Sequence, residues 1–468
     1  MSKSAIFFLV QYKNMCDVKQ TLTSVLNRNT DTFGAAPYLS KDGTKAYINY
    51  QITVVPGRQE NTEAEWFDII NGQLISTGIV SANGDNFFKL PEEGCDGTDN
   101  GAASDDFTRF SLLDEALVDE TSSLARLRIY DQNHNLIGQR IFGGQDDPYP
   151  YPACSFSLNG GNFSKNNKYV VISYVTQNPS DGNPAITVLR IIDVTQPGLP
   201  DAFTPITYNG NTGQNPDFVT LKHKCKKETY VFTYSTGGTF NANLGATNPP
   251  PPYLMLVYKL GTPGSTPKLV LQQNFGQSFG TSFLQKCKDR VHILVSVIRN
   301  VKPGELSEYI DNSAFQTDNG YFGNLGIYEF DGLELKLLGK RSFKLGPTAI
   351  WHPSGNYILA RFDQNKSVVS IDDTELSPTG PNIGVWLKVE GNHKNLHFKN
   401  ADADLFPMQI RPARTFSKDG KWLLVTASNS PFATNTGCGS PDVSTCVCNV
   451  GGQVLYNITL YKIKVQDD

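Results

Sequence analysis

The chain has 468 residues, of which 39% are hydrophobic, and its 41 basic and 45 acidic side chains give a formal net charge of −4. This composition excludes a disordered or collagen-like chain, and no run approaches the ~20 apolar residues of a membrane-spanning helix. The near balance of charge argues against a nucleic-acid-binding protein. Charged residues are only 18% of the chain, while 41 Gly, 27 Pro, 27 Phe and 20 Tyr favour strands joined by turns.

The N-terminal segment contains two apolar runs, residues 5–12 and 21–26. Lys3 precedes the first run, as in a secretory signal peptide, but the apolar core 5–10 is shorter than the ~7–15 residues of such a signal and no clear cleavage site follows. We therefore interpret residues 3–26 as spare strand material. One of the two runs is expected to pair with the C-terminal strand and so remove exposed sheet edges.

One sequence motif recurs along the chain. It consists of an apolar strand, a Gly-containing turn and a second apolar strand. Its clear copies span residues 36–48, 349–359 and 414–425, with Asp-Gly or Ser-Gly at the turn. Such a pair between apolar runs predicts a hairpin, because Gly accepts a positive φ without steric cost. Successive copies are about 63 residues apart. Weaker copies span residues 155–172, 218–232, 282–294 and 107–118, the last with Phe107–Phe110 as first strand and Glu115–Val118 as second.

A second pair of strands follows the hairpin, for example at residues 253–258 and 268–271. Four strands repeated seven times predict an all-β chain, a β-propeller of seven four-stranded antiparallel blades, because one blade alone cannot bury its faces. The alternative is a β-sandwich followed by a second all-β domain, although no change of composition marks a boundary. Residues 453–465 are expected to form the third strand of the last blade. Within a single domain, 1–468, the predicted blades are 33–82, 103–144, 150–210, 214–276, 279–344, 346–400 and 405–468, with a closing strand from 3–26.

The clear copies resemble the TolB-like and WD-repeat-like propeller motif, in which a strand ends in Trp-Ser-Pro-Asp-Gly-Lys and the chain re-enters as an apolar strand. Residues 351–356 and 416–421 carry the resemblance. It implies the blade architecture and leaves the function open, because such propellers serve as scaffolds, binding modules and enzymes.

In a propeller, the connections from second to third strand and from blade to blade lie on one face, and the short turns lie on the other. The sequence predicts long connections, rich in Asn, Gly, Ser, Thr and Pro, that crowd the first face. Long loops on a rigid scaffold often carry binding sites. Those connections are residues 55–65, 81–106, 144–152, 235–252, 299–323, 363–381 and 428–452, and the aromatic residues expected to contact a partner are Tyr149, Tyr151, Tyr309 and Tyr321.

Motifs that carry chemistry are sparse. The sequence contains no nucleophile elbow, phosphate-binding loop or dinucleotide fingerprint, and its six His residues form no recognisable metal spacing. Cys95–Gly101 with Asp105 and Asp106 faintly resembles a Ca²⁺ loop but lacks the terminal Glu, so we interpret it as an acidic turn. Polar residues could still converge in the central funnel, and the candidates there are Arg109, Asp217, Thr281, Arg411 and Arg414.

The placement of the cysteines leaves two settings open. Disulfides would indicate an extracellular or particle-surface protein, whereas reduced thiols would indicate a cytosolic one. The candidates for pairing are Cys95 and Cys154, on one predicted face, and Cys438, Cys446 and Cys448, which share one connection.

Together these features favour a non-enzymatic binding or assembly module that presents its loop-rich face to a protein or glycan partner. We expect no cofactor, no nucleic acid and no insertion into a membrane. The alternatives are a propeller hydrolase or lactonase with a polar site in the funnel, and a structural subunit of a larger particle.

Overall fold

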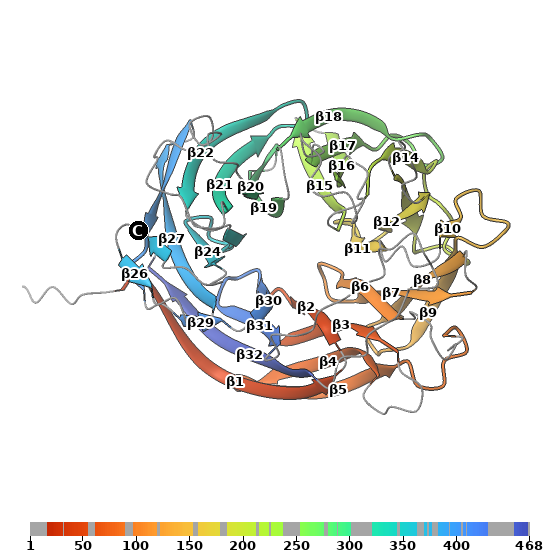
Figure 1. Cartoon of the computed structure of the whole chain (residues 1–468), viewed down its shortest axis with the longest axis horizontal. Helices are drawn as coiled ribbons and strands as arrows, with labels where there is room; N and C mark the ends of the chain where they lie inside the picture. Colours follow the sequence, from red (N-terminus) through yellow and green to blue (C-terminus); the bar gives the residue numbers. More distant parts are fainter. Residues whose placement is uncertain are drawn as a thin grey trace, which may run out of the picture.

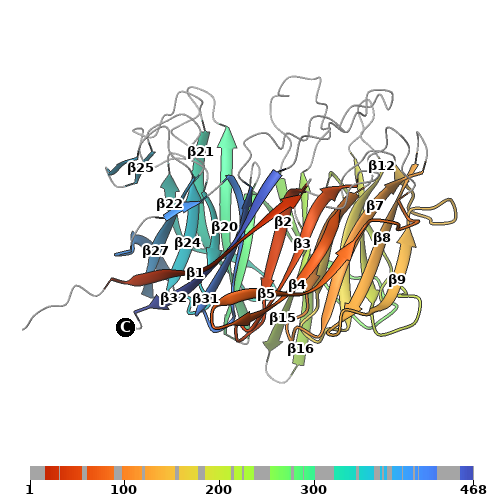
Figure 2. The ribbon, with the colours of Figure 1, turned by 90° about the horizontal axis from the view of Figure 1, so that it is seen from below.

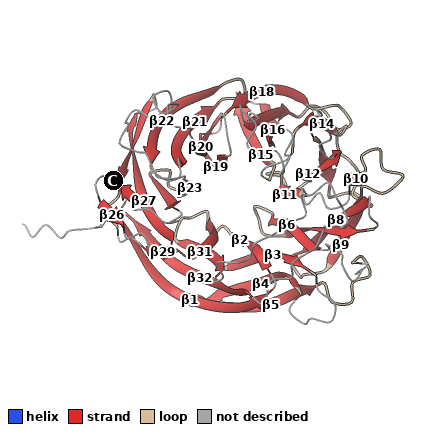
Figure 3. Ribbon diagram, in the orientation of Figure 1, coloured by secondary structure: helices blue, strands red, loops and turns tan. Residues whose placement is uncertain are grey.

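The chain forms a ring of antiparallel β-sheets arranged around a common axis (Figures 1 and 3). Among the described residues no helix has the length and apolarity needed to cross a membrane. The computed structural model describes residues 16–30, 32–54, 61–88, 97–118, 122–152, 158–177, 185–211, 215–223, 226–236, 253–275, 279–287, 289–300, 321–343, 347–362, 369–371, 374–376, 382–392, 394–403, 406–408, 410–428 and 454–466.

The ring is a seven-bladed β-propeller, as the repeat predicted, and in each blade the first strand lies innermost (Figure 1). Blades 1 to 3 are β2 (Thr32–Leu39), β3 (Lys45–Thr53), β4 (Thr62–Ile70) and β5 (Gln73–Ser81); β6 (Gly97–Ala103), β7 (Arg109–Leu117), β8 (Ser122–Asp131) and β9 (Leu136–Phe142); and β11 (Asn159–Phe163), β12 (Tyr169–Gln177), β13 (Ile186–Asp193) and β14 (Ile206–Asn209).

Blades 4 to 6 follow in chain order, and blade 7 combines both ends of the chain. Their strands are β15 (Asp217–His223), β16 (Lys226–Thr236), β17 (Tyr253–Lys259) and β18 (Lys268–Asn274); β19 (Phe279–Cys287), β20 (Arg290–Asn300), β21 (Tyr321–Phe330) and β22 (Leu335–Phe343); β23 (Pro347–Trp351), β24 (Tyr357–Phe362), β27 (Asn382–Asn392) and β28 (Asn395–Asn400); and β30 (Ile410–Phe416), β31 (Trp422–Ser428), β32 (Val454–Val465) and β1 (Val18–Thr30). Short additional strands are β10 (Tyr151–Pro152), β25 (Val369–Ile371), β26 (Thr374–Leu376) and β29 (Phe406–Met408).

The N-terminal strand closes the ring by pairing with the C-terminal one. β1 runs antiparallel to β32 from Val18 opposite Val465 to Thr30 opposite Val454, and Figure 1 shows the two side by side at the outer rim. The prediction that β32 is the third strand of the last blade is confirmed. Of the two N-terminal runs, the second supplies the closing strand, which extends to Thr30 rather than ending at residue 26.

A repeated polar turn joins the first and second strands of five blades. In blade 1 the Ser40 hydroxyl donates to Asp42 Oδ1 at 2.8 Å and accepts the Lys45 amide at 2.9 Å, and Gly43 has φ +68°. This arrangement satisfies the turn's polar groups and reverses the chain, as expected for an Asp-Gly turn. The equivalent turns start at Ser104, Ser164, His352 and Ser417.

The hairpin predicted for blade 2 is wrong by one strand. Residues 107–110 do not form the first strand, which is β6, and the second strand begins at Arg109. Phe107 stands where blades 1, 6 and 7 have Gly and blade 3 has Asn167, with φ +60° and a buried ring that packs against Phe110. A bulky residue rarely adopts this conformation, so the turn could not be recognised from its sequence. Gly97–Gly101, interpreted above as part of an acidic turn, lies in β6.

The hydrophobic core is divided among the contacts between blades. Within the described residues there are seven buried clusters, and each combines side chains of two neighbouring blades. Between blades 1 and 2, for example, Tyr47 and Trp66 pack against Phe110 with ring centroids 4.9 and 5.5 Å away. A blade is therefore stabilised by both neighbours, as expected for a repeat that cannot bury its faces alone.

The turn glycines provide a test of this packing. A methyl group at Gly43 would overlap the indole of Trp422 in blade 7, whereas one at Gly84, also at positive φ, would meet no atom within 4 Å. We expect Gly84→Ala to lower the free energy of unfolding by about 1 kcal/mol, the conformational cost alone. Gly43→Ala should cost clearly more in chemical denaturation. Equal losses in the two variants would contradict the proposed packing of the turn against Trp422.

Candidate functional site

Long connections and short turns are segregated on the two faces of the ring. The second strand of each blade ends, and the third begins, at the face drawn uppermost in Figure 2, where β20 ends and β21 begins. The β15–β16 hairpin lies at the opposite face (Figure 2). The longest connections between second and third strands belong to blades 4 to 7 and are residues 237–252, 301–320, 363–381 and 429–453.

Two of the predicted funnel residues lie close to the same tyrosine. Asp217 begins the inner strand β15, and its carboxylate accepts the Phe218 amide at 2.7 Å. Tyr234 and Thr281 share a hydrogen bond of 2.7 Å between their side-chain oxygens, which connects blades 4 and 5. Burial raises the pKa of Asp217 to about 7, and the Asp217 charge contributes, after burial, to the raised pKa of Tyr234.

A chain of amide side chains, which the sequence did not indicate, connects neighbouring blades. Gln51 donates to Asn100 Oδ1 at 3.1 Å, and Asn215 donates to the same oxygen at 3.4 Å. Asn215 in turn accepts the Gly160 amide at 3.0 Å. These residues belong to four consecutive blades, and the hydrogen bonds fix the inner edges of those blades relative to one another.

The predicted arginines contact neighbouring blades. Arg109 donates from blade 2 to the carbonyl of Asn167 in blade 3 at 3.1 Å, and Arg414 donates from blade 7 to the carbonyl of Thr348 in blade 6. Arg411 lies in β30, and its side chain is outside the described residues. Arg109 and Arg414 therefore connect neighbouring blades, and their described hydrogen bonds do not involve Asp217.

The predicted aromatic residues are dispersed. Tyr151 is buried and donates to Glu115 at 2.7 Å. Tyr149 is half-buried, with the Arg190 guanidinium 5.1 Å from its ring centroid. Tyr309 and the Tyr321 side chain lie outside the described residues, and so do the five cysteines considered for disulfides, Cys95, Cys154, Cys438, Cys446 and Cys448.

The described part of the chain contains no group of three or more His, Cys, Asp or Glu residues placed to hold a metal ion. Of the residues in the Ca²⁺-like segment, Asp105 pairs with Lys418 at 2.7 Å, and Asp106 accepts the hydroxyls of Ser104 and Thr108. Cys16 is free and exposed.

Buried ionisable side chains form a network between blades 1 and 2. The Arg128 guanidinium contacts Glu63 at 2.5 Å and Asp114 at 2.7 Å, and Arg126 contacts Asp114 and Asp85, each at 2.7 Å. Three carboxyl groups thus share two guanidinium groups. Burial and the neighbouring Asp114 charge raise the pKa of Glu63 to about 8. Glu63 and Glu65 are two residues apart, as are Arg126 and Arg128, so each pair lies on one face of its strand. This spacing is the only sequence signal that we find for the network.

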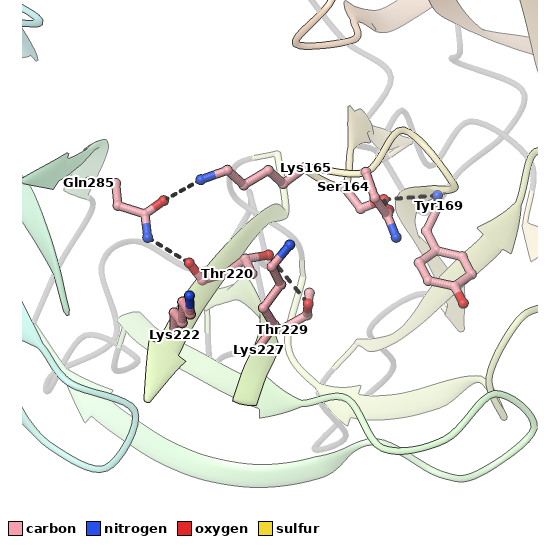
Figure 4. Close-up of a pocket in the computed structure, with 9 residues that line it drawn as sticks. Ser164, Lys165, Tyr169, Thr220, Lys222, Lys227, Thr229 and Gln285 are labelled. Carbon is pink, nitrogen blue, oxygen red and sulfur yellow. Dashed lines mark hydrogen bonds between the residues drawn. The ribbon is translucent and has the colours of Figure 1, made fainter. Parts of the chain in front are cut away.

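A cavity of about 750 Å³ lies on the short-turn face, at the junction of blades 3, 4 and 5. Lys165 reaches from the β11–β12 turn to Gln285 Oε1 at 3.0 Å, and the Gln285 amide donates to the Thr220 carbonyl at 2.7 Å (Figure 4). The cavity is lined by Ser164, Lys165, Asn166, Tyr169, Thr220, Lys222, Lys227, Thr229 and Gln285.

No protein-family model and no curated protein matches the chain. Among solved structures it is similar to the Dos1 propeller, at 12% identity over 95% of each chain with a TM-score of 0.45. It is also similar to hydrazine synthase of Kuenenia stuttgartiensis, at 10% identity over 85% of this chain and 92% of that one with a TM-score of 0.46. An α-L-arabinofuranosidase from Fusarium graminearum matches at 10% identity over 93% and 97%, with a TM-score of 0.39. These likenesses concern the fold alone.

The raised pKa of Glu63 predicts a pH dependence of stability. Because the folded state holds this proton up to a pH of about 8, whereas an unfolded Glu releases it near pH 4.3, the contribution of Glu63 to stability falls as pH rises between these values and is constant above them. Melting temperatures measured from pH 5 to 9 should therefore decline less in Glu63→Gln than in the wild type. Parallel profiles for the two proteins would contradict this protonation of Glu63.

Proposed function

We propose that the protein is a non-enzymatic binding module that presents the face of its second-to-third-strand connections to a protein or glycan partner. The observation that supports this proposal is the unequal length of the connections. First-to-second-strand turns span a few residues, while the second-to-third-strand connections of the four consecutive blades 4 to 7 are long, residues 237–252, 301–320, 363–381 and 429–453.

The frame under these connections is suited to this role. Each blade is held by buried clusters on both sides, and side-chain hydrogen bonds join neighbouring blades. A rigid frame lowers the entropic cost of ordering a binding surface. The composition of the long connections, rich in Asn, Gly, Ser, Thr and Pro, suits amide and hydroxyl contacts with a partner. The similarity of the turns to TolB-like and WD-repeat-like propellers, which include binding modules, is consistent with this proposal.

One observation favours a second candidate, a hydrolase with its site in the funnel. Asp217 lies on an inner strand with a pKa of about 7, which is the range suited to a general acid or base. Its described hydrogen bond is the one from the Phe218 amide, and its charge acts on Tyr234, which is hydrogen-bonded to Thr281. If Asp217 is catalytic, a hydrolytic activity found by screening esters, lactones and glycosides should be lost in Asp217→Asn.

Replacement of residues 301–320 by a Gly-Ser linker tests the binding proposal. The cut must spare β20 and β21, because Asn300 pairs with Tyr321 and Ile298 with Gly323. Partners recovered by affinity purification with the wild-type protein should be lost. As a control, the same exchange at residues 261–264, on the short-turn face, should leave them bound. Recovery of the same partners with both variants would contradict the proposal for this connection, and size-exclusion chromatography would reveal self-assembly as the alternative.

A further inference from the structure

The cavity on the short-turn face is positively charged in a protein whose net charge is negative. Three of its lining residues are lysines, Lys165, Lys222 and Lys227, and none is acidic. The nearest acid in sequence, Glu228, is engaged elsewhere, since it pairs with Lys259 at 2.7 Å and accepts the Tyr230 hydroxyl at 2.7 Å. The cavity therefore has uncompensated positive charge for a ligand.

Two of these lysines form a like-charge pair. Lys222 and Lys227 stand directly opposite each other in the β15–β16 hairpin, and both are exposed. Within the described part of the chain, neither lysine side chain makes an ion pair or a hydrogen bond. Like charges at opposed positions of antiparallel strands are destabilising. Such an unfavourable pair of charges is typical of a binding site, where residues needed for function are kept although they lower stability. The remainder of the hairpin sequence adds Lys224 and Lys226.

The third lysine is held in place. Gln285 of blade 5 accepts from the Lys165 ammonium of blade 3 and anchors its own amide on Thr220 of blade 4. In Figure 4 the Lys165 chain reaches across the cavity toward Gln285, with Lys222 and Lys227 on the adjoining hairpin. Blades 4 and 5 differ at this junction from the five blades with the repeated polar turn, because their first strands continue to His223 and Cys287.

The neutral groups identify the class of ligand. The Thr220 and Thr229 hydroxyls are 3.3 Å apart, Asn166 and Gln285 contribute amides, and Tyr169 contributes a half-buried ring to the wall. A volume of about 750 Å³ is in the range of small-molecule sites and larger than one inorganic anion needs. Hydroxyl and amide groups beside a tyrosine side chain suit the hydroxyls of a pyranose, while the lysines suit an anionic substituent.

We propose that this cavity binds an acidic sugar, a pyranose that carries a carboxylate or a sulfate group. Lys222 and Lys227 contact the anionic substituent, Lys165 approaches from the opposite wall, and the threonine and amide groups receive the sugar hydroxyls. The site lies on the face opposite the long connections, so it is independent of the binding function proposed above.

Calorimetry with four probes tests the proposal: a hyaluronan tetrasaccharide with carboxylates only, a chondroitin sulfate tetrasaccharide with sulfates in addition to carboxylates, a neutral chitin tetraose, and sodium phosphate. At least one acidic tetrasaccharide should bind, whereas the chitin tetraose should not, and binding should weaken with added salt. Loss of a charge-assisted hydrogen bond should lower affinity about tenfold or more in Lys222→Gln/Lys227→Gln. Lys268→Gln, at an exposed lysine of β18 outside the cavity, is the matched control and should bind as the wild type does.

The melting temperature of the double variant distinguishes a loss of binding from a loss of folding. Because the double variant removes a repulsion, its melting temperature should equal or exceed that of the wild type, so lost binding would not result from unfolding. Three results would overturn the proposal: no acidic tetrasaccharide binds, the double variant binds as tightly as the wild type, or sodium phosphate binds as tightly as the sugars. The last result would identify a simple anion site.

Discussion

The pairing of β1 with β32 is the constraint on which the rest of the structure depends. Six blades are built from strands adjacent in sequence, whereas the seventh takes three strands from the C-terminal end and its outer strand from Val18–Thr30. Each buried cluster needs two neighbouring blades, so an open ring would expose the faces of blades 1 and 7. Closure by strand pairing links local blade formation to the stability of the whole ring.

The contacts between blades account for most of the notable polar residues. Arg128 and Glu63 join blades 1 and 2, and Arg109 and Arg414 donate to carbonyls of adjacent blades. A buried charged group needs a partner, and for these arginines the neighbouring blade supplies it, so they are distributed between blades and do not gather at one site. Hydroxyl and amide side chains such as Tyr234 with Thr281 and Gln51 with Asn100 also join adjacent blades.

The fold could be predicted because its signal is periodic, while the sites depend on contacts between repeats. Gly43 and Gly420 mark their turns in the sequence, but the turn of blade 2 has Phe107 at the equivalent position, and its first strand was therefore missed. The approach of Asp217 and Thr281 to a common tyrosine, like the lysine cavity of blades 3 to 5, joins residues of different blades. The spacing of residues within one repeat does not show which residues of other blades lie next to them. The faces of the long connections could be predicted from the order of the strands alone.

The two faces of the ring have different chemistry, with long connections on one and a lysine-lined cavity on the other, and closure holds both in place. Amide hydrogen exchange of β1 tests this account most directly. If closure is part of one cooperative unit, the amides of Val18–Thr30 that pair with β32 should be protected as strongly as those of β31 and should exchange only with global unfolding. Fast exchange in β1 while the other blades stay protected would contradict it.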